Sequence, residues 1–293
     1  MEDNVNLPVL NNSIFRHLHV FWWNGGGALV KRLRVNPVLK SLLSKEKVDV
    51  FCYGEALISS YNGKLLNGFE CYLHRAYLHQ KGNYRRGLAI FFQEKYKFLF
   101  SKVYACRKFD IVWMKLAAST ENLFFCFFYA PGDHHEPPVR QLFYDFLSRT
   151  YHKFASQGKV YLLGDTNARI GQFTNDRDIN GKFVSNRNRN LLMSFLEYSG
   201  LSVLNKLYQS GIPTYEIPRK KRSIIDMGFT NSISSVINFT VLPQFLGVSS
   251  QTCHKVLSLC VNLKNIPHNS SLEGPTFKRF KTPKSPGANR RCF

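Results

Sequence analysis

Polar residues stand at the ends of five short apolar runs, where a rigid sheet can direct side chains from different runs to one place. They are Asn24, Glu55, Tyr129, Asp165 with Asn167, and Asp226, and His254 stands just before a later apolar run. Taken singly, each is better explained as an ordinary turn or core residue, because Asn and Asp are common where strands end. Taken together, they are candidates for one shared site.

A set of this kind suits the hydrolysis of phosphate diesters. At neutral pH that reaction needs a hard cation to neutralise charge on the phosphoryl group, and Mg²⁺ takes one or two carboxylates plus oxygens of the substrate. Glu55 is the candidate carboxylate ligand. A protonated histidine would donate to a phosphate oxygen. Because a lone histidine is usually structural, this role for His254 depends on its pairing with Asp226.

The runs that carry these residues are short and β-rich. Strands are expected at residues 18–24, 48–55, 87–93, 109–116, 123–130, 159–165, 223–230 and 255–261, and many are apolar on both faces, as central strands are. Helices are expected from Asn36, where Pro37 takes the first helical position, from Pro138, and over residues 188–198. Since strands clearly outnumber helices, we predict stacked sheets with helices outside, a layered α/β sandwich.

The chain carries a large positive charge. Its 293 residues include 40 Lys and Arg but only 19 Asp and Glu, which gives a formal charge of +21. Residues 263–293 contribute +6 of this, so we predict a basic, disordered tail after one domain at residues 14–262, with an extension at residues 1–13. Nucleic acid is the first partner that the charge suggests, although solvated faces or an anionic membrane surface would also account for it.

Cysteine usage and hydropathy bear on the compartment. The seven cysteines lie mostly in apolar runs and lack the spacing of a zinc site, so they are expected to be reduced core residues. The start of the chain, MEDNVNLPVL, is acidic where a secretory signal would be basic, and no apolar stretch approaches the ~18 residues of a membrane span. We therefore expect an intracellular protein, nuclear or cytoplasmic, that is not secreted.

The order of the strand ends is the most specific signal. An asparagine, a glutamate, YAP, GDxNA, SxID and a late histidine together resemble the motif series of the endonuclease/exonuclease/phosphatase superfamily, also called deoxyribonuclease-I-like. Within it, GDTNARIG, NRNRNLLMSFLEYSGLSVLN and GIPTY before SIIDMGF are most similar to the endonuclease domains of LINE-type retrotransposons. The resemblance covers roughly residues 18–262 and implies a four-layer α/β sandwich, in which two mixed, mostly antiparallel sheets pack face to face with helices outside.

The resemblance also implies a role for each site residue. Asp165 would orient or deprotonate the attacking water, Asn167 would bind the phosphate, and Tyr129 would stabilise the developing charge. His254 would donate to a phosphate oxygen, and Asp226 would fix its tautomer. The implied reaction is the nicking of duplex DNA, and a reverse transcriptase from the same element would be a partner.

The metal site implied by the resemblance is incomplete. Glu55 and Asn24 would hold Mg²⁺, or Mn²⁺, with its water shell. The family pattern ends in Ser-Asp-His, whereas this chain reads Thr252, Cys253 and His254, so the aspartate that lies close to the metal in relatives is missing. A cysteine has a usual pKa of ~8.5, so its thiol is neutral at neutral pH, and it is a poor ligand for magnesium. We therefore expect weaker metal binding.

Candidate DNA contacts come from basic loops and from the resemblance. The loop HQKGNYRRG and the expected hairpin PRKKRS should contact phosphates, although PRKKR is equally explained as a nuclear-import signal or a solvated turn. The basic residues concerned are Lys81, Arg85, Arg86, Lys220, Lys221 and Arg222. By resemblance, Thr214 and Arg169 would line the same face. Residues 25–27 are all glycine but lack the ending of a phosphate-binding loop, so we expect a turn there.

Two other functions remain open. Cys253 favours a catalytically weakened or silent descendant that binds nucleic acid or a protein. A phosphatase or phospholipid phosphodiesterase of the same superfamily is the other possibility, although abundant Lys and Arg favour a long polyanion over a small phosphate.

Overall fold

Two six-stranded sheets form the framework of the computed structural model. The structure describes residues 17–27, 41, 43, 47–60, 65–78, 84–106, 108–117, 122–242 and 253–263. The expected helix from Asn36, the extension and the basic tail lie outside these ranges, apart from the helical residues 41 and 43.

The first sheet has the strand order β15-β16-β1-β2-β6-β3. The bounds are β15 Val236–Leu242, β16 Val256–Asn262, β1 His17–Asn24, β2 Val50–Gly54, β6 Leu88–Gln93 and β3 Phe69–His74. Strands β1 and β2 run parallel, and every other neighbouring pair is antiparallel.

The second sheet has the strand order β11-β14-β10-β9-β8-β7. The bounds are β11 Ser202–Val203, β14 Asp226–Thr230, β10 Gly158–Asp165, β9 Asn122–Tyr129, β8 Asp110–Ala117 and β7 Phe100–Ala105. Only β9 and β10 are parallel. Both sheets are therefore mixed and mostly antiparallel, which confirms the predicted fold class.

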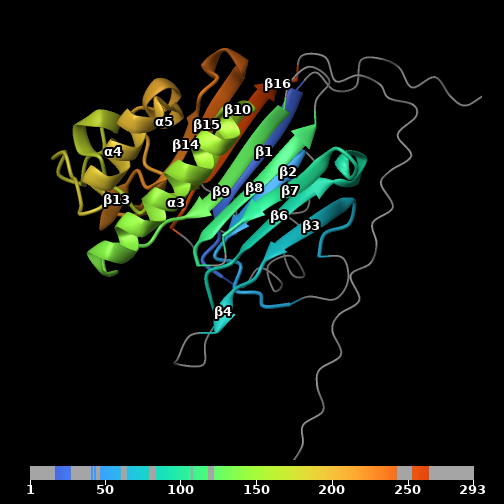
Figure 1. Cartoon of the computed structure of the whole chain (residues 1–293). Coiled ribbons are helices and arrows are strands. Elements are labelled where there is room, and N and C mark those ends of the chain that lie inside the picture. Colours follow the sequence, from blue (N-terminus) through green and yellow to red (C-terminus); the bar gives the residue numbers. More distant parts are fainter. Residues whose placement is uncertain are drawn as a thin grey trace, which may run out of the picture.

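Apolar side chains on both faces of the central strands explain why these strands are covered on both sides. In β9, Phe125 and Phe127 join the core between the two sheets, whereas Phe124, Cys126 and Phe128 face the other way into a second core. The second core lies beneath α3, Pro137–Ala155, which runs along the outer face of this sheet in Figure 1. Each face buries large side chains, so the sheet is held between two apolar layers.

Two of the three expected helices lie within the described residues, and both fit their predicted positions. Helix α3 begins with two prolines at its first turn, one residue before the predicted start, and buries Phe143, Leu147 and Phe154. Helix α4, Arg189–Ser199, ends at Gly200, whose φ of 66° is the left-handed conformation of a C-terminal cap. A short helix that was not predicted, α5, spans Leu204–Tyr208.

Two small ribbons complete the described part of the chain. They pair β12 (Tyr215–Ile217) with β13 (Lys221–Ser223) and β4 (Tyr77–Leu78) with β5 (Tyr84–Arg85). The first is the hairpin expected at PRKKRS. Among the residues that the structure describes, no helix combines the length and the apolar character that crossing a bilayer requires.

Candidate active site

A row of polar residues crosses one end of the second sheet. Asp165 lies opposite Tyr129 on one side and opposite Asp226 on the other, and Asp110 lies opposite Tyr129. Strands β8 and β14 are antiparallel to β9 and β10, so their first residues lie beside the last residues of β9 and β10. With neighbouring strands about 4.8 Å apart, the row spans about 15 Å. Asp110 was not among the predicted site residues.

The first sheet supplies Asn24 and Glu55 at the same end. Asn24 ends β1 and is buried, and its Nδ2 donates to Asp165 Oδ2 at 3.0 Å, which joins the two sheets at the site. Glu55 follows β2 with a φ of 53°, and its carboxylate lies close enough to the Tyr129 hydroxyl to act on the pKa of that hydroxyl. Burial, followed by the charges of Asp165 and Glu55, raises the pKa of Tyr129, so this hydroxyl stays protonated.

The glycines at residues 25–27 form the expected turn. Gly26 and Gly27 have φ values of 60° and 92°, which glycine adopts at no steric cost. The Gly26 N–H donates to Asn24 Oδ1 at 3.1 Å, and the Tyr53 hydroxyl donates to the Gly27 carbonyl at 2.6 Å. The turn therefore orients the Asn24 amide toward Asp165.

His254 and Asp226 form a buried pair. His254 Nδ1 lies 2.7 Å from Asp226 Oδ2, while Asp226 Oδ1 accepts from Trp22 Nε1 at 3.0 Å. Burial acts to lower the pKa of His254, but the Asp226 carboxylate and the charges of Asp165 and Glu55 outweigh it and raise the pKa to about 9. The imidazolium therefore dominates at neutral pH, and Nε2 is the ring nitrogen that remains for a ligand.

The donor atoms at the centre fit a hard cation. One ligand atom each from Asp165, Asp226 and His254 lie within 4.8 Å of one another. Burial, followed by the charge of Asp226, raises the pKa of Asp165 to about 7, which reflects carboxylates held close together in a dry site. A divalent cation would relieve that repulsion with carboxylate oxygens as its ligands, which suit magnesium, whereas the protonated His254 is a hydrogen-bond donor and not a ligand. The predicted ligands Glu55 and Asn24 adjoin this cluster through Tyr129 and Asp165, respectively.

The GDTNARIG loop is held by a network of asparagines. The Asn167 N–H donates to Asp165 Oδ1 at 2.8 Å, and Asn167 Nδ2 donates to the Ala130 carbonyl at 2.9 Å. Asn186 and Asn188 each donate to the Asn167 carbonyl, at 2.8 and 3.1 Å. Sequence reasoning missed these supports, although both lie in the NRNRN segment that it singled out.

Two residues expected to face DNA are instead built into the structure. Thr214 is buried, and its hydroxyl accepts from the N–H groups of Ile225 and Asp226, both at 3.0 Å. Arg169 is 12% exposed and grips Asp176 with Nε and Nη2, both at 2.8 Å. Both side chains therefore help to hold the loops around the site.

The basic residues expected at the surface are placed in part. Lys81 lies outside the described residues, and Arg85 is described only as backbone in β5. Arg86 Nη2 lies 3.3 Å from His135 Nε2, in the loop that follows β9.

The hairpin of β12 and β13 carries the second basic group. Lys220 is exposed in its turn, and Lys221 Nζ lies 5.4 Å from the centroid of the Tyr215 ring. Arg222 Nε donates to the carbonyls of Arg177 and Asp178, at 3.2 and 2.9 Å. Arg222 therefore attaches the hairpin to the neighbouring loop, whereas the two lysines are presented outward.

Cys253 lies outside the central group of donor atoms. Its thiol pairs with the Tyr215 hydroxyl, and burial together with this contact raises the pKa of Tyr215. The Tyr215 ring meets His254 edge to face at 4.8 Å. Cys253 is absent from the group of donor atoms at the centre, although its neighbour His254 belongs to it.

Comparison with known proteins adds a fold-level result. No family model and no curated protein matches the sequence. Among solved structures, the AP endonuclease LMAP from Leishmania major is similar, with a TM-score of 0.68 and 14% identity over 84% of this chain and 88% of that one. The endonuclease domain of TRAS1, a telomere-specific non-LTR retrotransposon, gives a TM-score of 0.61 and 15% identity over 85% and 100%. The 3′-5′ exonuclease NExo from Neisseria meningitidis gives 0.61 and 16% over 83% and 98%.

At these identities the likeness establishes the fold. The two mixed sheets, the helices outside them and the motif order all agree with it. The chain has the deoxyribonuclease-I-like fold of the endonuclease/exonuclease/phosphatase superfamily.

Proposed function

We propose that this chain is a magnesium-dependent phosphodiesterase that nicks one strand of duplex DNA. The observation that carries the proposal is the convergence of Asp165, Asp226 and His254, with donor atoms within 4.8 Å of one another, beside Glu55 and Asn24. The similar structures include two endonucleases and an exonuclease, and the 3′ phosphatase NExo was observed with a product DNA hairpin. They give no support for a reverse transcriptase partner.

The metal would be held mainly by Glu55, with Asn24 and Asp165 beside it. When bound, Mg²⁺ would neutralise charge on the phosphoryl group. Beside that cation Asp165 would be held as the carboxylate, which can accept the proton of the attacking water. Asn24 and the Asn167 N–H hold its two oxygens, at 3.0 and 2.8 Å, which orients the carboxyl toward one face.

Three further side chains serve the phosphate. His254 is protonated at neutral pH and would donate from Nε2 to a phosphate oxygen, while Asp226 holds its Nδ1. Tyr129 keeps its proton and would donate to the oxygen on which charge develops. Asn167 would bind another phosphate oxygen through its side-chain amide.

Positive charge favours a long polyanion as the substrate. We assign the backbone contacts to Arg86, Lys220 and Lys221, together with Lys81 and Arg85 of the same basic loop. The formal charge of the whole chain, +21, would raise the rate at which DNA is encountered at low salt.

Nicking of supercoiled plasmid in Mg²⁺ tests the proposal. Asp165→Ala and His254→Ala should each abolish the nicked product. Asp145→Ala and His152→Ala are matched controls, because they replace the same residue types on the exposed face of α3. Equal product from all five proteins, or none from any, would refute these roles. Hydrolysis of a phospholipid or inositol phosphate headgroup with no action on DNA would assign a different substrate in the same superfamily.

A second candidate is a silent descendant that binds nucleic acid or a protein, favoured by Cys253 and its contact with Tyr215. Salt-sensitive DNA binding without cleavage would support it. In that case Cys253→Asp, which restores the family's carboxylate, should create nicking activity.

A further inference from the structure

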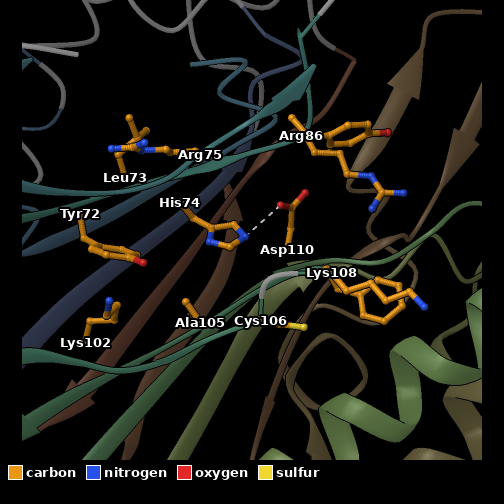
Figure 2. Close-up of a pocket in the computed structure, with 12 residues that line it drawn as sticks. Tyr72, Leu73, His74, Arg75, Arg86, Lys102, Ala105, Cys106, Lys108 and Asp110 are labelled. Carbon is orange, nitrogen blue, oxygen red and sulfur yellow. Dashed lines mark ion pairs between the residues drawn. The ribbon is translucent and has the colours of Figure 1, made fainter. Parts of the chain in front are cut away.

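A pocket of about 420 Å³ lies beside the active site, where β3 and β7 come together at one edge of the two sheets. Four cationic side chains line it, namely Arg75, Arg86, Lys102 and Lys108, with one carboxyl, Asp110. Figure 2 shows Asp110 with His74 near the middle of the lining residues, with Lys102 to one side and Arg86 and Lys108 to the other. The lining therefore carries a clear excess of positive charge.

Aromatic rings of the pocket hold three of these cations in place. Lys102 Nζ lies 5.0 Å from the centroid of the Tyr72 ring, and Lys108 Nζ lies 5.9 Å from that of Phe109. The Arg86 guanidinium lies 5.5 Å from the Tyr77 ring. All three rings also line the pocket. Because cations already lie over these rings, the pocket suits a phosphate group better than a stacked base.

The acid in the pocket does little to offset the cations. Asp110 is buried, accepts from the Gly87 N–H at 3.4 Å and has an oxygen 3.4 Å from His74 Nε2. Burial raises the pKa of Asp110 to about 7, although the charge of Arg86 acts in the opposite direction. Near pH 7 a part of the Asp110 carboxyls is therefore neutral. Burial lowers the pKa of His74, which makes this ring a neutral partner.

The pocket is close enough to the centre to serve the same nucleic acid strand. Asp110 lies opposite Tyr129, which lies opposite Asp165, so two strand spacings of about 4.8 Å separate Asp110 from the proposed base. In B-DNA each strand carries one phosphate per about 3.4 Å of helix axis. A phosphate within about three positions of the scissile phosphate along the strand can therefore reach the pocket.

We propose that the pocket between β3 and β7 binds a second phosphate group of the nucleic acid, about 10 Å from the phosphate that is cleaved. This inference rests on the proposed function. It assigns Lys102 and Lys108 to a phosphate near the cleaved position of the nucleic acid strand. The same chemistry would accept a free phosphorylated molecule, so the test must separate a backbone phosphate from a small ligand.

The test compares a pocket variant with a matched control. Lys102→Gln with Lys108→Gln removes two exposed cations that lie over rings. Lys153→Gln with Lys206→Gln is the control, because these exposed lysines also lie over rings, of Phe154 and Phe173, but on α3 and α5. Binding of a fluorescent 20-base-pair duplex in EDTA is followed by anisotropy across a salt series, and thermal unfolding checks that each variant folds.

The expected result is a change in salt dependence confined to the pocket variant. The slope of log K against log salt should fall in magnitude by about 0.9, the value for one phosphate contact, while the control keeps the wild-type slope. Calorimetry with pyrophosphate separates the ligand sources. Pyrophosphate binding that the pocket variant loses, with no change in the DNA slope, would assign the pocket to a small phosphorylated ligand and overturn the proposal.

The failure of this inference differs from failure of the proposed function. A wild-type chain that nicks plasmid, with equal DNA slopes in all variants, overturns the second phosphate site and leaves the nuclease standing. A wild-type chain that neither binds nor nicks DNA overturns both.

Discussion

Replacing Asp226 by asparagine should remove most of the charge that keeps His254 protonated. In the structure, His254 Nδ1 lies 2.7 Å from Asp226 Oδ2, and its pKa is raised to about 9 although burial alone would lower it. Relative to an ordinary value of about 6.5, this corresponds to about 3 kcal/mol in favour of the charged ring. In Asp226→Asn the amide preserves the shape, so we expect the pKa of His254 to fall to about 6.5 or below.

Nuclear magnetic resonance titration of the imidazole, without metal, measures this change directly. The pKa of His254 is raised in the folded state, so its contribution to stability is fully present below pH 6.5 and is lost as the pH rises through about 9. Between pH 6.5 and about 9, the free energy of unfolding of the wild type should therefore fall. The same interval should bring no such fall in Asp226→Asn. At pH 7.5 a pKa of about 6.5 leaves only about one ring in ten protonated, so the variant should also nick plasmid about 10-fold more slowly.

One result would contradict this account. An imidazole pKa that is the same in wild type and Asp226→Asn would show that another group holds the proton. Asp145→Asn, on the exposed face of α3, is the control and should change neither the titration nor the rate.

Other substitutions test the supports of the site. Asp165→Asn should abolish nicking yet raise the melting temperature at pH 8. Because the pKa of Asp165 is raised to about 7 in the folded state, stability is lost between about pH 4 and about pH 7, and at pH 8 the fold carries the full cost of the charged carboxylate beside Asp226. Calorimetry that shows a lower melting temperature would contradict this. Thr214→Val removes the acceptor of two backbone N–H groups and should cost about 1–3 kcal/mol in urea unfolding. Asp176→Asn leaves Arg169 buried without its partner and should cost about 3–5 kcal/mol, whereas an unchanged unfolding midpoint would show that the pair is dispensable.

The strands that could be predicted are those in the middle of the sheets. Residues 123–130 read as a strand because both faces of β9 are buried, so the run is apolar throughout. Strands β3, β7 and β15 were not predicted, and each lies at the edge of a sheet. An edge strand is half exposed, as the burial of β7 shows, so its residues lack a continuous apolar run.

The candidate site residues could also be predicted, because the type and order of residues are given by the sequence itself. Asp165, Asp226 and His254 were predicted as one site, and the structure brings their donor atoms within 4.8 Å of one another. Asp110 was not predicted, and the antiparallel pairing of β8 with β9 carries it to the same edge.

The sequence did not show which polar side chains are buried. Thr214 and Arg169 lie beside the motifs and were expected to face DNA, yet one is enclosed beneath Asp226 and the other is paired with Asp176. The type of a polar residue does not show whether its side chain faces water or a hydrogen-bond partner. The partner lies on a segment that only folding brings near. The amino-acid order thus specified which polar residue types stand at the ends of the strands, whereas the packing of two sheets against each other determined which of them lie together and which are enclosed.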